Sequence, residues 1–150
     1  MAMPKRISIL FFIGIFAVGS TALGYYYYFV YVPPLKAAQK FMDDMETNDA
    51  NALRQDVVVS VGLDSGSLRP PDEDEIKMLL DDHFERGRIL DERTREGRSR
   101  NYNYLVYREP DGGVFALVVT LYNGRYRVVI PEAQMSSKKH RYLWDYTWTN

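Results

Sequence analysis

The sequence predicts an α+β protein: an N-terminal membrane helix, then further helices, then an antiparallel sheet packed on those helices. Three observations lead to this class. The chain begins with a long apolar stretch, apolar residues then recur at helical spacing, and after Gly87 they alternate as in strands. Because helices come first and strands joined by short turns follow, we expect a β-meander with one face covered by helices.

Composition narrows the classes of function. The chain has 150 residues, enough for one domain, and a formal net charge of −1, which argues against a general nucleic-acid binder. It has no cysteine, which excludes disulfides, thiolate catalysis, zinc–thiolate sites and iron–sulfur clusters. Because Lys5 and Arg6 are the only charges before residue 33, residues 33–150 hold 17 basic and 20 acidic residues. An apolar segment is therefore joined to a mildly acidic domain.

The apolar segment predicts a transmembrane helix over 7–32. About 20 apolar residues cross a bilayer core of about 30 Å, and no charge occurs between Arg6 and Lys36. The end of the segment carries tyrosines suited to the aromatic belt at a membrane surface: Tyr25, Tyr26, Tyr27, Tyr28 and Tyr31.

The charges around the segment predict its orientation. Lys5 and Arg6 should hold residues 1–6 in the cytoplasm, so the domain is expected on the other side of the membrane, which is the periplasm if the source is a bacterium. Lys36 and Lys40 follow the segment and reduce this asymmetry.

Two alternatives for the segment stay open. Its basic start, apolar centre and small residues at 19–24 also fit a cleaved signal peptide. A mature chain beginning near the tyrosines would expose an aromatic surface to water, which favours an uncleaved anchor. A buried core helix is the other alternative.

Small residues recur on one side of the predicted span. They are Gly14, Ala17, Thr21 and Gly24. Small side chains let a second membrane helix approach closely, so this side is a candidate helix-packing face. We expect partners among other membrane-complex subunits, and a homo-oligomer stays open.

The domain, residues 33–135, is expected to begin with helices. Pro33 and Pro34 should end the span, because proline disfavours helix in the residue before it. Apolar residues at helical spacing then predict helices over 35–47 and 49–55.

A strand and a third helix should follow. A β-branched run predicts a strand over 57–61, and a Gly-, Ser- and Pro-rich stretch predicts a loop as far as residue 71. The third helix should start at Pro71, where acidic residues face the positive end of the helix dipole, and end at Gly87.

The remainder of the domain predicts a meander. Asn123-Gly124 is a preferred two-residue hairpin turn, because both residues tolerate positive φ. The expected strands run over 88–95, 98–108, 114–122 and 125–130.

This order resembles the nuclear-transport-factor-2-like (cystatin-like, SnoaL-like) superfamily. The resemblance covers about 35–132, and Tyr126 stands where that family often has Trp. The resemblance rests on three segments: LKAAQKFMDDMETNDANAL at 35–53, the helix ending DDHFERGRIL at 81–90, and the hairpin GGVFALVVTLYNGRYRVVIPE at 112–132. It implies a curved sheet wrapped round a helix, with a conical cavity. Some members are isomerases or dehydratases, and many are non-catalytic binding or assembly modules.

Few residues suggest chemistry. An isomerase in such a cavity would need a carboxylate base facing a tyrosine or a protonated acid, and His83, Tyr102 and Tyr104 are the candidate cavity residues, although ordinary packing roles account for them as well. His83 and His140 are the only histidines, and phosphate-loop and nucleophile-elbow motifs are absent. We therefore expect no catalytic residue, metal or cofactor.

Residues 136–150 form a basic run followed by an alternating aromatic run. Period two places its four rings on one face of an extended strand: Tyr142, Trp144, Tyr146 and Trp148. One interpretation is a last strand or arm packed on its own domain. The other is a docking element, added to a partner's sheet edge or held at the bilayer surface.

These features favour a non-catalytic, single-pass membrane protein whose extracytoplasmic domain serves interaction or assembly as an accessory subunit. The alternative is a small-molecule binding protein or isomerase-type enzyme that uses the conical cavity of the same fold.

Overall fold

The computed structural model describes residues 5–61, 67–82, 84–94 and 102–135. The chain forms two compact units, Met1–Pro33 and Pro34–Asn150.

The N-terminal unit is helical and apolar. It consists of α1 (Lys5–Tyr26) and the π-helical turn η1 (Tyr27–Tyr31). Its large apolar side chains are exposed: Phe12 is 70%, Phe16 is 77% and Leu23 is 71% exposed. Among the described residues, one helical stretch, within Phe12–Glu46, is long and apolar enough to cross a membrane, and that window is not buried.

The helical backbone does not end at the two prolines. Helix α2 (Val32–Glu46) begins one residue before Pro33 and includes both prolines in its first turn. Proline has no amide hydrogen, and this loss costs least in the first turn of a helix. The Val32 amide donates to the Tyr27 carbonyl five residues back, in the pattern of a π-helix. The two prolines therefore do not interrupt the helical backbone, and the end of the membrane span at these residues stays a prediction.

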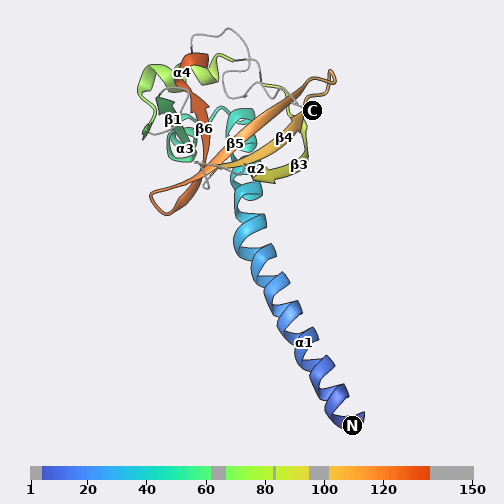
Figure 1. The fold of residues 1–150 in the computed structure, drawn as a ribbon. Coiled ribbons are helices and arrows are strands. Elements are labelled where there is room, and N and C mark those ends of the chain that lie inside the picture. The colour runs from blue at the N-terminus through green and yellow to red at the C-terminus, as the bar shows by residue number, and fades with distance from the viewer. Residues whose placement is uncertain (1–4, 62–66, 83, 95–101, 136–150) are drawn as a thin grey trace. The chain divides into compact units, whose positions relative to one another are not determined.

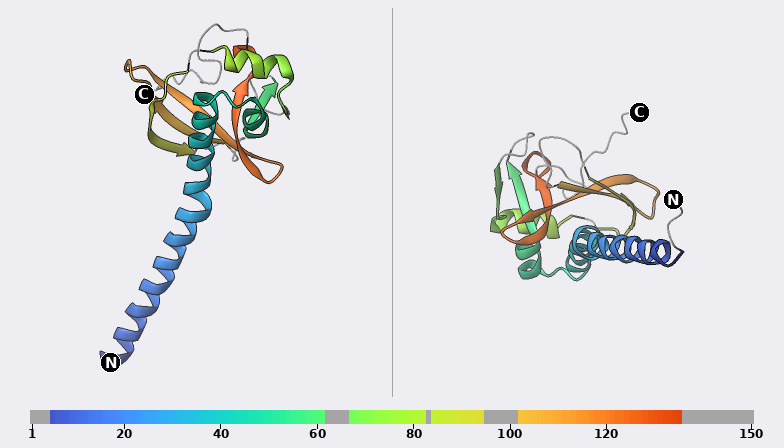
Figure 2. Two further views of the ribbon diagram at one scale, coloured as in Figure 1. Left: turned by 180° about the vertical axis from the view of Figure 1, so that it is seen from behind. Right: turned by 60° about the horizontal axis from the view of Figure 1, so that its bottom comes forward.

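The domain is a six-stranded sheet whose helices α2, α3 and α4 pack on one face (Figures 1 and 2). The strand order is β2-β1-β6-β5-β4-β3. The remaining elements are α3 (Ala50–Asp56), β1 (Val57–Val61), β2 (Ser67–Arg69), α4 (Glu73–Leu80), β3 (Arg88–Thr94), β4 (Tyr102–Arg108), β5 (Val114–Tyr122), β6 (Arg125–Pro131) and the 3-10 turn η2 (Glu132–Gln134). The α+β class, with helices preceding the meander, is confirmed.

Two features of the predicted sheet were wrong. Strand β1 runs parallel to β6, with Val57 opposite Val128, so the sheet is mixed; the other four pairs are antiparallel. A meander pairs strands that follow one another in sequence, whereas β1 pairs with β6, the last strand of the meander. The sheet is also not strongly curved, in contrast to the shape that the family resemblance implies.

The third helix starts as predicted and ends early. Asp72 caps α4, and the helix stops at Leu80, whereas Gly87 was the expected end. Asp81 and Asp82 follow Leu80, and acidic side chains at a helix C-terminus face the negative end of its dipole. The short strand β2 lies inside the predicted loop, and the hairpin turn is confirmed by φ values of 49° at Asn123 and 78° at Gly124.

The strand residues are buried in a different pattern from those of a sheet that has one face in solvent. Helices and sheet share one apolar cluster, in which Phe41, Leu53 and Leu79 are fully buried against the strands. On the central strands, however, consecutive residues are buried: 57–60 on β1, 116–120 on β5 and 128–131 on β6. Because neighbouring strand residues point to opposite faces, both faces of the sheet centre are covered.

Candidate functional site

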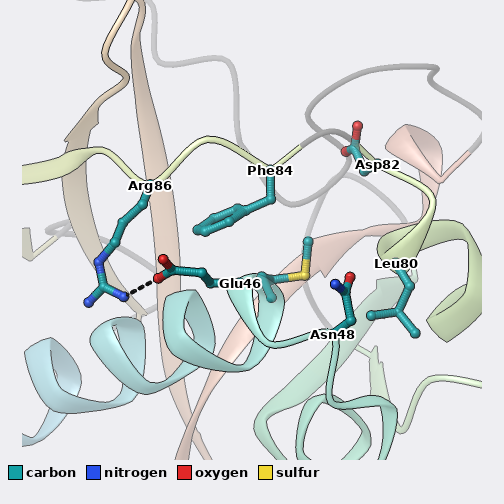
Figure 3. Close-up of a pocket in the computed structure, with 7 residues that line it drawn as sticks. Glu46, Asn48, Leu80, Asp82, Phe84 and Arg86 are labelled. Atoms are coloured by element: carbon teal, nitrogen blue, oxygen red, sulfur yellow. Dashed lines mark hydrogen bonds and ion pairs between the residues drawn. The ribbon is translucent and has the colours of Figure 1, made fainter.

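A pocket of about 260 Å³ opens beside the C-terminal end of α2 (Figure 3). Its apolar wall consists of Met45, Leu80 and Phe84. Polar groups complete it: Glu46, Asn48, Asp82 and Arg86. The residues come from the end of α2 and the turn after it, from the end of α4, and from the segment that leads to β3.

Local backbone and charge positions shape this pocket. Asn48 ends the α2 turn with a φ of 53°, a left-handed conformation that asparagine tolerates better than most residues. Arg86 reaches back to α2, where its Nη1 lies 2.6 Å from Asp43 Oδ1 and 2.7 Å from Glu46 Oε2. Both pairs are exposed, so they position the segment before β3 more than they stabilise the fold.

The described lining of the pocket combines an apolar wall with two carboxylates and one guanidinium group. Its described lining contains no hydroxyl, thiol or imidazole group that could act as a nucleophile. Within the described part of the chain, no group of three or more His, Cys, Asp or Glu residues is placed to hold a metal ion. An apolar wall beside the carboxylates of Glu46 and Asp82 suits a small molecule with an apolar body and a cationic group.

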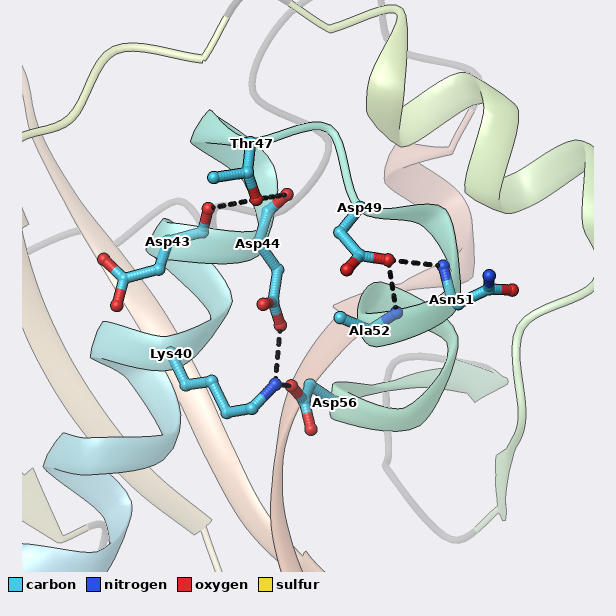
Figure 4. A network of polar contacts seen from close by, with 8 residues as sticks. All are labelled: Lys40, Asp43, Asp44, Thr47, Asp49, Asn51, Ala52 and Asp56. Atoms are coloured by element: carbon cyan, nitrogen blue, oxygen red, sulfur yellow. Dashed lines mark hydrogen bonds and ion pairs between the residues drawn. The ribbon is translucent and has the colours of Figure 1, made fainter.

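A second polar cluster joins α2 to α3 (Figure 4). Lys40 Nζ donates to Asp44 Oδ2 at 3.0 Å and also to Asp56 Oδ2, so two carboxylates share one ammonium group. Asp49 caps α3 by accepting from the amides of Asn51 and Ala52, each at 3.0 Å.

Asp44 is the unusual group of this cluster. It is 9% exposed, and burial raises its pKa to about 6, with the hydrogen bond to Asp56 adding to the shift and Lys40 opposing it. A carboxyl group with a pKa near 6 changes charge close to physiological pH. We therefore expect the charge of this cluster to depend on pH. The cluster shares no residue with the pocket of Figure 3, so the two are separate sites.

The structure describes two of the three predicted cavity residues, Tyr102 and Tyr104, and places them on one sheet face. His83 lies outside the described residues. Tyr102 is 7% exposed and Tyr104 is half-buried, and both belong to the apolar cluster on the sheet face opposite the helices. Between helices and sheet, the described side chains form one packed cluster in the region where the resemblance places a cavity.

The predicted helix-packing face lies on α1. Gly14, Ala17 and Thr21 are exposed and Gly24 is half-buried. A methyl group added at Gly14 or Gly24 would meet no atom within 4 Å in the structure as described. The Thr21 hydroxyl donates to the Ala17 carbonyl at 2.8 Å. The other predicted interface, formed by Tyr142, Trp144, Tyr146 and Trp148, lies outside the described residues.

Sequence reasoning missed the pocket and the Lys40 cluster. The i,i+4 spacing of Lys40 and Asp44 was a usable signal for one ion pair. Asp56 and Arg86 meet α2 only after the chain has turned back, so no local pattern indicates these contacts.

The fold defines an α+β protein with an apolar N-terminal helix. No protein-family model and no curated protein matches the chain. A solved structure described as a de novo designed protein with curved β-sheet aligns with it at 12% identity and a TM-score of 0.35, over 69% of this chain and 88% of that one. A likeness this weak assigns neither a family nor an activity, and membership of the nuclear-transport-factor-2-like superfamily stays a prediction.

Proposed function

We propose that this chain is a single-pass membrane protein whose domain serves as a non-catalytic accessory or assembly subunit. The exposed apolar surface of α1 carries the proposal. Over 22 residues a helix extends about 33 Å, and a hydrocarbon core is about 30 Å thick. Side chains such as Phe12, Phe16 and Leu23 find in lipid the apolar surroundings that they lack in water.

The end of the apolar segment supports an interfacial position. Tyr25, Tyr26, Tyr27 and Tyr28 are between 52% and 68% exposed. Tyrosine rings at headgroup level bury their apolar body and keep the hydroxyl in water. With Lys5 and Arg6 at the other end, the N-terminus lies in the cytoplasm and the domain outside it.

The small-residue face supports a partner within the membrane. Without large side chains at Gly14, Ala17, Thr21 and Gly24, a second helix can approach the backbone of α1 closely. The bond from Thr21 to the Ala17 carbonyl keeps its hydroxyl satisfied in lipid. The partner is another membrane helix, either from a different subunit or from a second copy.

Single cysteines test the anchor and its orientation, because the natural chain has none. We choose Ala2→Cys near the N-terminus and Asp111→Cys in the exposed β4–β5 turn. In bacterial spheroplasts, a membrane-impermeant maleimide should label the Asp111→Cys variant directly and the Ala2→Cys variant only after permeabilisation. The reverse pattern would contradict the orientation. Two results together would contradict the anchor. Alkaline carbonate would release the protein from membranes, and its intact mass would correspond to a chain that begins near residue 20–25.

A second candidate function is small-molecule binding, which the pocket beside α2 favours. In contrast to the predicted conical cavity, this pocket lies at the ends of α2 and α4. Benzylamine, with an apolar ring and a cationic amine, should shift the methyl resonances of Met45 and Leu80 and leave that of exposed Leu121 unchanged. Unchanged Met45 and Leu80 signals at saturating benzylamine would contradict this function.

A further inference from the structure

The sheet face turned away from α2, α3 and α4, the second sheet face, is buried although none of these helices covers it. Val58, Val118 and Val129 are 0%, 1% and 0% exposed and form their own cluster there. By strand alternation, Val106 and Ala116 lie on the same face, and they are 2% and 0% exposed.

The described residues on this face form too thin a cover. Leu68, Tyr104 and Tyr122 pack partly against the cluster. Arg127 lies 5.3 Å from the Tyr122 ring centre, and its Nε atom is buried. An antiparallel sheet with one solvated face shows alternating exposure along each strand. Continuous burial on β1, β5 and β6 therefore requires a further layer.

Composition indicates which part of the chain can supply that layer. Of the three longer stretches of the domain outside the described residues, 62–66 has one leucine and 95–101 has no apolar residue. Residues 136–150 carry two tryptophans, two tyrosines and a leucine. Since a buried aromatic side chain covers about 150–250 Å², this last stretch has the apolar area to cover the face.

We infer that residues 142–148 lie on the second sheet face, with their rings turned toward Val58, Val118 and Val129. The chain has the reach to do so. Residues 136–150 follow Met135, a core residue whose side chain is only 6% exposed. Met135 comes just after β6, which lies inside the sheet. Six further residues span up to about 20 Å, and an extended 142–148 is about 23 Å long, close to the width of five strand spacings. The aromatic arm is thus the third layer of its own domain.

Both tryptophans of the chain, Trp144 and Trp148, lie in this arm, so tryptophan fluorescence reports on it alone. A nitroxide attached to a single cysteine quenches a ring that it touches. On β5, Tyr122→Cys places the label on the second sheet face, and its neighbour Leu121→Cys places it on the opposite side. Tyr104→Cys and Asn103→Cys form the same pair on β4.

In the full chain, in detergent micelles, we expect severalfold stronger quenching from positions 122 and 104 than from 121 and 103. Equal quenching from both sides would overturn the inference. So would quenching seen only when a labelled W144F/W148F chain is mixed with the natural chain, because the arm would then cover a second copy. Strong quenching by brominated lipid in vesicles would place the rings in the bilayer and also overturn it.

Truncation gives an independent test. Ending the chain at residue 141 should raise hydrogen exchange across β5 and β6 severalfold, because the second sheet face loses its cover. The matched control ends at residue 148, after the last ring, and should exchange like the natural chain. Unchanged exchange after removal of 142–150 would overturn the inference, and recovery of membrane partners tests the proposed function separately.

Discussion

The hydroxyl group of Tyr107 fixes the chain between α4 and β3. It donates to the Glu85 carbonyl and accepts from the Gly87 amide. Burial raises the pKa of Tyr107 to about 12, so the hydroxyl stays protonated at physiological pH. Gly87 is required beside it, because an added methyl group would overlap the Arg108 carbonyl and the Tyr107 ring.

We expect Tyr107→Phe to lower the free energy of unfolding by about 1–3 kcal/mol, since two partly buried backbone groups lose a partner. Urea denaturation followed by circular dichroism in mild detergent measures this. Tyr126→Phe, in the same apolar cluster, is the matched control and should cost less than about 0.5 kcal/mol. Equal losses in the two variants would show that the hydroxyl does not hold this segment.

Asp44 should give the domain a pH dependence of definite sign. Its folded pKa of about 6 exceeds the usual value of about 3.9 in an unfolded chain. The folded state therefore binds the proton more tightly, and the stability from this group is present below pH 4 and is lost as pH rises through 6. Asp44→Asn should remove this loss and raise the free energy of unfolding at pH 7.5 by on the order of 1 kcal/mol.

Unfolding free energies at pH 4.5, 6.0 and 7.5 test this sign. Lys40 keeps Asp56 as its partner in the variant, so no ammonium group is left unpaired. Asp74→Asn, whose side chain is 83% exposed, is the control and should follow the natural chain. An Asp44→Asn variant with the same pH slope as the natural protein would contradict the assignment.

At the residue scale, the sequence predicts contacts between near neighbours and misses those between distant segments. The positive φ of Asn123 and Gly124 follows from their residue types. The hydrogen bonds of Tyr107 and the ion pairs of Arg86 join residues 20 to 43 positions apart, and nothing in their local pattern indicates the partner. For this reason the pocket beside α2 could not be predicted.

At the element scale, α4 depends on its N-terminal cap. Asp72 Oδ1 accepts from the Glu75 amide at 2.8 Å, and Glu75 Oε2 accepts from the Asp72 amide at 2.9 Å. Glu75 also binds Arg69 through both carboxylate oxygens, at 2.6 and 2.7 Å, which lowers the pKa of Glu75. One carboxylate thus caps the helix and holds it to the strand before it.

Asp72→Ala should lower the free energy of unfolding by about 1 kcal/mol, as loss of a helix cap does. Denaturant titration with circular dichroism provides the measurement. Asp74→Ala, in the same first turn but exposed, should cost less than about 0.5 kcal/mol. A larger loss for Asp74 than for Asp72 would contradict the role of the cap.

Elements with strong local signals were predicted well, and their ends less well. Strand β1, the β5–β6 hairpin and the start of α4 follow from β-branched runs, turn residues and acidic first turns. The end of α4 was wrong because apolar spacing continues to Phe84, which packs on the core from a non-helical segment. Spacing alone cannot distinguish a helical residue from a loop residue that reaches the same core.

At the scale of the whole molecule, the small-residue face of α1 predicts which substitutions disturb assembly. Gly14→Ile should lower severalfold the recovery of partners in mild detergent, because the added side chain separates the helices. Gly19→Ile is the matched control: Gly19 lies on the other side of α1, and an added methyl group there also meets no described atom within 4 Å. Equal recovery from both variants would remove this face from the proposal.

The class of the molecule could be predicted, and its sheet order could not. Helices before strands follow from the change of hydrophobic period. The pairing of β1 with β6 joins the two ends of the domain, and the many Val residues of both strands fit several partners equally well. The burial of the second sheet face was equally hidden, because the sequence of β5 is apolar except for Thr120 and fits one or two covered faces.

The parallel pairing of β1 with β6 delays the completion of the sheet during synthesis. Val57 must wait for Val128, which is made 71 residues later, and at about 5–20 residues per second the ribosome needs roughly 4–14 s for that interval. During this time β1 has only the three-residue β2 as a sheet neighbour. Until Val128 has been made, a chain emerging helix-first therefore presents an apolar strand without its main partner, and a chaperone can bind there.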